Sequence, residues 1–225
     1  MSFIPGMFPG KLMTGKGSPS LSFIGVTPDV SNLTVYTFTN HAIGDADPTR
    51  RVVVAVSLGF NAAGGQTLAS ATIGGIAATI HVQLGSQDCV AIISALVPTG
   101  TTATIVITAS AVAARAAVAV YRAINETVAT FHQTQTDGTL TGAVLSVAIN
   151  IPASGWVVAI SQFNGNVTTT WAGVVEQYDA LYSDLNVNYS GGFSSGLPPE
   201  TGRTVSATAS VVPGVAPRLA AMSWG

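Results

Sequence analysis

The chain has 225 residues, of which 48% are hydrophobic and only 8% are charged, and its formal net charge at pH 7 is −2. High hydrophobicity with little net charge excludes a disordered chain. Sparse charges of mixed sign exclude a basic nucleic-acid groove or a patch for acidic lipids, so we expect no nucleic-acid partner. Because no apolar run reaches the ~18 residues of a membrane span, we also expect no membrane insertion.

The first twenty residues differ from the rest of the chain. They contain three prolines and four glycines, which forbid a regular element. They are nevertheless hydrophobic, with apolar side chains at Phe3, Ile4, Met7, Phe8, Leu12 and Met13. We predict that residues 1–20 are an extended docking arm that lies in a groove on another surface. The alternative, an arm packed on its own domain, stays open.

After residue 20 the chain becomes a series of short strand-like runs separated by turn residues. Residues 52–56 are continuously apolar, which is typical of a central strand covered on both faces. Turn signals include Gly74-Gly75 and Gly191-Gly192. The alanine-rich stretch 110–119 would also suit a short helix, although its β-like continuation favours a strand. The strand-like ranges are 22–26, 33–39, 51–57, 76–82, 89–96, 103–108, 115–122, 127–132, 143–151, 155–163, 167–171, 185–189, 203–210 and 218–224.

This pattern predicts an all-β fold: an antiparallel two-sheet sandwich, jelly-roll-like, formed by one domain over residues 21–225. No strict internal repeat is visible in the sequence. The single cysteine, Cys89, lies in an apolar run and is expected to be a buried strand residue.

The sequence offers little that resembles a catalytic or metal site. Residues 192–196 (GFSSG) match the nucleophile elbow of hydrolases, but Pro198 and Pro199 block the helix that must follow, and all three histidines lie upstream. Asp45 and Asp47 lack the further oxygen ligands that Ca²⁺ needs. We therefore expect no enzyme activity, no cofactor and no metal.

Aromatic and acidic residues gather between residues 171 and 184. Aromatic faces stack on sugar rings and carboxylates bind sugar hydroxyls, so a carbohydrate-binding site is a second hypothesis. Its residues would be Trp171, Tyr178, Tyr182 and Asp179. A glycoside hydrolase that uses Glu176 with Asp179 or Asp184 is a third. Ordinary packing of these aromatics at strand ends is the simplest alternative.

From about residue 50 onward, the amino-acid sequence of the predicted strands and turns resembles that of β-sandwich surface proteins of tailed bacteriophages. The similar stretches are 71–78 (ATIGGIAA), 95–103 (ALVPTGTTA), 118–122 (VAVYR), 155–159 (GWVVA) and 220–224 (AAMSW). The resemblance implies a virion structural protein, such as a head decoration protein or a short tail fibre or spike, assembled in the host cytoplasm. Its partners would be other virion proteins of the capsid or tail and further copies of itself, with a host glycan as a further possibility. The short arm departs from long fibres, whose sandwich follows a repetitive shaft.

Overall fold

The computed structural model describes residues 19–59, 64–126, 131–138, 142–182, 186–213 and 217–225. In these ranges the chain forms strands, turns and loops but no helix, and so no helix that could cross a membrane. All strand pairs are antiparallel, which confirms the predicted all-β, sandwich-like fold.

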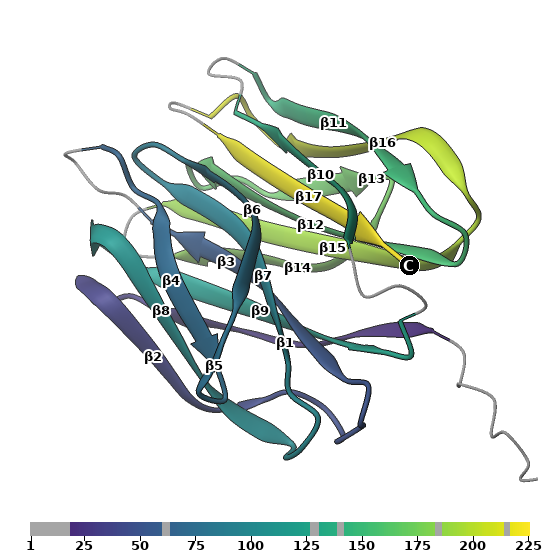
Figure 1. Cartoon of the computed structure of the whole chain (residues 1–225). Coiled ribbons are helices and arrows are strands. Elements are labelled where there is room, and N and C mark those ends of the chain that lie inside the picture. Colours follow the sequence, from purple (N-terminus) through teal and green to yellow (C-terminus); the bar gives the residue numbers. More distant parts are fainter. Residues whose placement is uncertain (1–18, 60–63, 127–130, 139–141, 183–185, 214–216) are drawn as a thin grey trace, which may run out of the picture.

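The strands form four sheets, which stack as four layers (Figure 1). The first outer sheet contains, in spatial order, β2 (Leu33–Ala42), β8 (Thr102–Ala113), β4 (Leu68–Ile73) and β5 (Ile76–Ala77). The first inner sheet contains β1 (Ser20–Asp29), β9 (Ala116–Ile124), β3 (Arg51–Leu58), β7 (Cys89–Leu96) and β6 (Thr79–Gly85). The second inner sheet contains β10 (Phe131–Asp137), β17 (Arg218–Trp224), β12 (Gly155–Asn164), β15 (Val187–Leu197) and β14 (Val175–Tyr182). The second outer sheet contains β11 (Val144–Ile151), β16 (Glu200–Ala209) and β13 (Thr169–Ala172).

The two halves of the chain have the same topology. If the two-residue β5 is left out of the count, each half runs through eight strands. Its inner sheet then has the order first, eighth, third, sixth, fifth, and its outer sheet the order second, seventh, fourth. This interleaving is that of a jelly roll, with the fifth strand on the inner sheet. The expected jelly-roll-like sandwich therefore occurs twice, as two tandem sandwiches within residues 21–225.

A pair of hydrogen bonds recurs at the same place in both halves. The Ser110 N–H donates to the Thr67 carbonyl at 2.9 Å, and the Thr67 N–H donates to Ser110 Oγ at 2.9 Å. In the second half the Ser210 N–H donates to the Thr168 carbonyl at 2.8 Å, and the Thr168 N–H donates to Ser210 Oγ at 3.1 Å. Each pair joins the start of the fourth strand to the seventh strand of its own half, so the repeat extends to side-chain detail.

Three apolar layers separate the four sheets. One fills the first sandwich and one fills the second. The third, which we call the middle layer, lies between the two inner sheets. Four of the nine buried residues on its first-half side are alanines, and five of the ten on its second-half side are aromatic, so small and large side chains share the layer. The alanines are Ala55, Ala117, Ala119 and Ala123, and the aromatics are Trp156, Tyr178, Tyr182, Tyr189 and Trp224.

Two local predictions are confirmed by the inner and outer sheets. Residues 52–58 of β3 are fully buried, because this strand has a sandwich core on one face and the middle layer on the other. Gly74 and Gly75 have φ of 61° and 77° and connect Ile73 to its partner Ile76, which is the geometry of a tight hairpin turn.

Arg50 is a charged residue with no exposed surface, immediately before β3. Its Nε donates to the Val97 carbonyl at 2.7 Å, and its two Nη atoms donate to the carbonyls of Gly44, Thr99 and Gly100 at 2.7–2.9 Å. The guanidinium thus holds the loop before β3 against the connection between β7 and β8.

We expect Arg50→Met to lower the free energy of unfolding by about 2–4 kcal/mol, because four carbonyl groups around a fully buried guanidinium would lose their donor. Equilibrium urea unfolding measures this change. As a control, Arg203→Met should cost no more than about 1.5 kcal/mol, since Arg203 forms a partly exposed ion pair with Glu200 at 2.8 Å. Equal costs for the two variants would contradict the assigned role of Arg50.

Candidate functional site

The residues predicted to dock on a partner, Phe3, Ile4, Met7, Phe8, Leu12 and Met13, lie outside the described residues. The structure describes the chain from Pro19, one residue before β1 begins at Ser20.

The aromatic platform predicted for a glycan is not present as an exposed surface. Tyr178 is 7% exposed and Tyr182 is 1% exposed, and both rings pack in the middle layer. Tyr178 stacks on Phe23 with ring centroids 5.8 Å apart, and the Tyr182 ring lies 4.3 Å from that of Tyr189. Rings enclosed between two sheets cannot stack on a sugar, so the prediction that these tyrosines share an exposed rim is wrong. Alternation along β14 turns both tyrosines inward, and the sequence does not show that a second sheet covers that face.

Trp171 and Asp179 belong to a structural network in the second sandwich. The Trp171 indole N–H donates to Ser190 Oγ at 2.8 Å. The Asp179 carboxylate accepts from the Thr169 N–H at 3.0 Å and from Asn188 Nδ2 at 2.6 Å. Asn188, which is 1% exposed, also donates to the Val167 carbonyl and accepts from Thr169 Oγ1. These polar groups fasten β13 to β14 and β15.

The predicted turn at Gly191-Gly192 is wrong, because both glycines lie inside β15. A Cβ on Gly191 would come within 2.4 Å of the Tyr178 hydroxyl, and one on Gly192 would come within 2.6 Å of the Val175 carbonyl oxygen. These glycines therefore let the edge strand β14 and its buried tyrosine approach closely. The GFSSG sequence is accordingly part of a strand and not an elbow between a strand and a helix.

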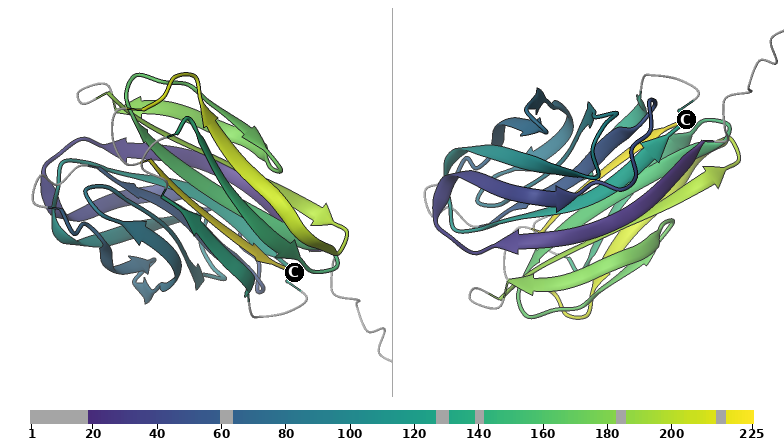
Figure 2. Two further views of the ribbon diagram at one scale, coloured as in Figure 1. Left: turned by 90° about the horizontal axis from the view of Figure 1, so that it is seen from above. Right: turned by 90° about the horizontal axis from the view of Figure 1, so that it is seen from below.

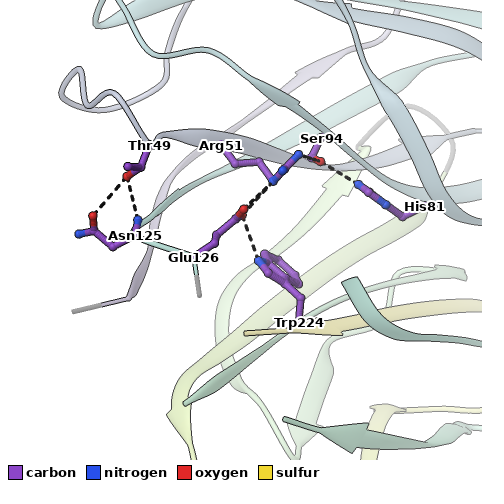
Figure 3. Close-up of polar contacts among 7 residues, drawn as sticks. All are labelled: Thr49, Arg51, His81, Ser94, Asn125, Glu126 and Trp224. Carbon is purple, nitrogen blue, oxygen red and sulfur yellow. Dashed lines mark hydrogen bonds and ion pairs between the residues drawn. The ribbon is translucent and has the colours of Figure 1, made fainter. Parts of the chain in front are cut away.

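Charged groups that the sequence did not single out lie at one end of the middle layer (Figure 3). Glu126, 8% exposed, accepts from Arg51 Nε at 2.9 and 3.0 Å through its two oxygens and from the Trp224 indole N–H at 3.2 Å. Because Arg51 and Glu126 belong to the first half and Trp224 ends the second, this contact joins the two sandwiches. The same end contains the bond from the Asn125 N–H to Thr49 Oγ1 at 2.9 Å.

A Ser–His pair extends this end of the layer (Figure 3). Ser94 Oγ lies 2.7 Å from His81 Nε2 and accepts from Arg51 Nη1 at 3.2 Å. Burial, followed by the charge of Arg51, lowers the pKa of His81 from 6.5 to about 4. The imidazole is therefore neutral at pH 7 and a weak base, and Ser94 is only 1% exposed. The pair can link β6 to β7, but it does not present a nucleophile to a substrate.

A groove of about 740 Å³ lies between β1 and β2, and we call it the edge groove. Residues 24–30 and 37–42 line it. The two strands lie next to each other at the face seen from below (Figure 2, right), and Thr27 Oγ1 bridges them at 3.0 Å from His41 Nε2. Val30 is 55% exposed, and Asp29 is the one formally charged side chain in the lining.

Both walls of the edge groove are edge strands. Within the described ranges β1 pairs with β9 alone and β2 pairs with β8 alone, so each strand has one edge without a ladder partner. Such edges are templates for an added strand. Each wall has a register shift, between Phe23 and Gly25 in β1 and between Phe38 and His41 in β2, and these irregularities limit indiscriminate pairing.

The equivalent edge of the second sandwich is closed by side chains. There the Ser146 N–H of β11 donates to Asp137 Oδ2 of β10 at 2.8 Å, and the Asn150 N–H donates to Gln133 Oε1. The described parts of the two repeats thus differ in the groups that join their first two strands: two backbone N–H groups donate to side chains in the second sandwich, and a Thr27–His41 side-chain contact spans the first. The edge groove could not be predicted from the sequence, because the order of strands within each sheet determines which strands lie at an edge, and the sequence does not show that order.

Other chemistry is sparse in the described part of the chain. No group of three or more His, Cys, Asp or Glu residues there could hold a metal ion. Cys89 is a buried free thiol of the first sandwich core, as predicted, and burial raises its pKa to about 12.

Comparison of the chain with protein-family models, with curated proteins and with solved structures finds no match in any of the three.

We expect the protein to lose stability between pH 6.5 and pH 4 through His81. The unfolded state binds a proton near pH 6.5, whereas the folded state resists it until about pH 4. The contribution of neutral His81 to the free energy of unfolding is therefore fully present above pH 6.5 and is lost as the pH falls toward 4. The free energy of unfolding should decrease by up to about 2 kcal/mol once partial solvent exposure is allowed for. Urea unfolding at pH 7.5, 5.5 and 4.5 should show a smaller decrease for His81→Gln than for the unaltered chain. Equal decreases would contradict this role.

We expect Asn188→Ala to lower the free energy of unfolding by about 2–3 kcal/mol, because it leaves Asp179 and Thr169 with missing partners inside the sandwich. Thr170→Ala on the exposed face of the neighbouring strand is the control and should change it by less than about 0.5 kcal/mol. If the network did not stabilise the sandwich, both variants would change the free energy of unfolding by similar, small amounts.

Proposed function

We propose that the chain is a non-enzymatic structural protein of a tailed phage particle, a head decoration protein or a short fibre or spike, held in place by residues 1–20. The observation that carries this proposal is the open edge groove of the first sandwich, which lies between two strands that each have an edge without a ladder partner. An assembly subunit needs such a surface, and a chain with only 8% charged residues has little charge repulsion to oppose contact with neighbours.

Further support comes from the use of polar groups in the interior. Ser94 and His81 link strands, Glu126 neutralises Arg51, and Asp179 orders a strand edge. Polar side chains that are bonded to neighbouring strands in this way make the folded protein more rigid. A rigid module that presents uncharged sheet faces suits a particle surface.

Deletion of residues 1–18 should abolish incorporation into particles while the folded part stays intact. Since β1 begins at Ser20, we expect the truncated chain to melt within about 2 °C of the full chain by circular dichroism. Loss of the fold on deletion would contradict a docking role for the arm. Incorporation that persists without the arm would also contradict it.

The location is tested by immunogold electron microscopy. Antibodies raised against the purified chain should label tailed particles purified from the source culture by density gradient. Antigen found only in the fraction without particles would refute the proposed function.

A further inference from the structure

The edge groove has the form of a receptor for an extended segment. Its two walls provide unpaired strand edges, and Thr27 with His41 forms a polar bridge between them. A segment added here would gain main-chain hydrogen bonds from a wall and could bury side chains against Ile24 and Val30. The register shifts in both walls restrict the length that can pair.

The chain's own first residues match this receptor in chemistry. Residues 1–18 carry two lysines, Lys11 and Lys16, and no acid, whereas all 10 Asp and Glu residues lie in the remainder of the chain. Asp29 is the one formally charged side chain that lines the edge groove. A cationic segment with apolar side chains therefore meets a groove of mixed polar and apolar lining that carries a single negative charge.

The direction of β1 favours a second copy as the source of the segment. Ser20 pairs with Ile124 at one end of β1, while the edge groove begins at Ile24 and follows the strand toward Val30. Continuing the line of β1 backward from Ser20 therefore leads away from the molecule's own groove. A neighbouring copy can be reached without such a reversal. Eighteen extended residues span up to about 60 Å, which exceeds the ~33 Å of a ten-residue strand.

We propose that the edge groove binds residues 1–18 of a second copy of this chain, which add to an open strand edge of the first sandwich. This inference rests on the proposed function and names the partner of the arm. Residues 1–18 and the edge groove are different parts of the chain, so the contact is heterologous and links copies into a ring or a row.

Cross-linking of two differently tagged copies tests the proposal. One copy carries Phe8→Cys and the other carries Val30→Cys, and the two are coexpressed and treated with a bismaleimide. The buried Cys89 thiol, whose pKa is about 12, does not compete. We expect a cross-linked species that contains both tags. Val144→Cys on the second sandwich is the matched control, since Val144 is 52% exposed and Val30 is 55% exposed, and it should give no such species.

A charge exchange provides an independent readout. Asp29→Lys in the full chain should weaken self-association at least about tenfold by analytical ultracentrifugation. Adding Lys11→Glu and Lys16→Glu to the same chain should restore it. Failure of the restoration, or absence of the two-tag species, would overturn the proposal.

The outcomes separate this inference from the proposed function. If arm deletion prevents particle incorporation but Val30→Cys gives no cross-link between copies, the inference is wrong and the structural role stands. If one chain carrying both cysteines cross-links within itself instead, the arm lies on its own sandwich and the inference is overturned. If the arm is dispensable for particles, the proposed function fails, whatever the cross-links show.

Discussion

The apolar contact between the two inner sheets is the interaction on which the rest of this structure depends. Apolar side chains of both inner sheets fill this layer, including alanines of the first half and tryptophans and tyrosines of the second, so neither sandwich has a solvated inner face. Burial of this area from water is the main driving force that holds the halves together. Polar contacts align its ends: Glu126 with Trp224 at one end, and Ser57 with Gln162 at 2.8 Å at the other.

The middle layer also explains what remains available for contact with other molecules. Two sandwiches that cover each other's inner sheets leave the outer sheets and the strand edges exposed. The outer sheets alternate, as in β8, whose inward residues are apolar and whose outward residues include Thr102, Thr104 and Thr108. Side chains tie the first two strands of the second sandwich, while the corresponding strands of the first enclose the edge groove. The attachment that we propose through this groove would follow from this asymmetry between two otherwise similar halves.

The sequence predicts local structure well here, because strand and turn signals are local. The buried run of β3 and the Gly74-Gly75 hairpin follow from periodicity and turn chemistry. The tandem repeat cannot be recognised from the sequence. Two similar segments, VVAVS at residues 53–57 and VVAIS at residues 157–161, do not occupy equivalent positions in the two sandwiches. Val54 faces the core of its sandwich, whereas Val158 at the same place in the phrase faces the middle layer. A shift of one residue reverses the faces of a strand. The tyrosines of β14 were misassigned for a related reason, as alternation marks the apolar face of a strand but not whether a second sheet covers it.

If the middle layer makes one folding unit of two jelly rolls, the two halves must unfold together. Equilibrium urea unfolding of the full chain tests this directly, with tryptophan fluorescence reporting the layer through Trp156 and Trp224 and far-ultraviolet circular dichroism reporting the strands. The account predicts that both signals follow one coincident transition. A fluorescence transition that is complete at a lower urea concentration, with much of the strand signal retained, would show that the sandwiches are independent and would contradict it.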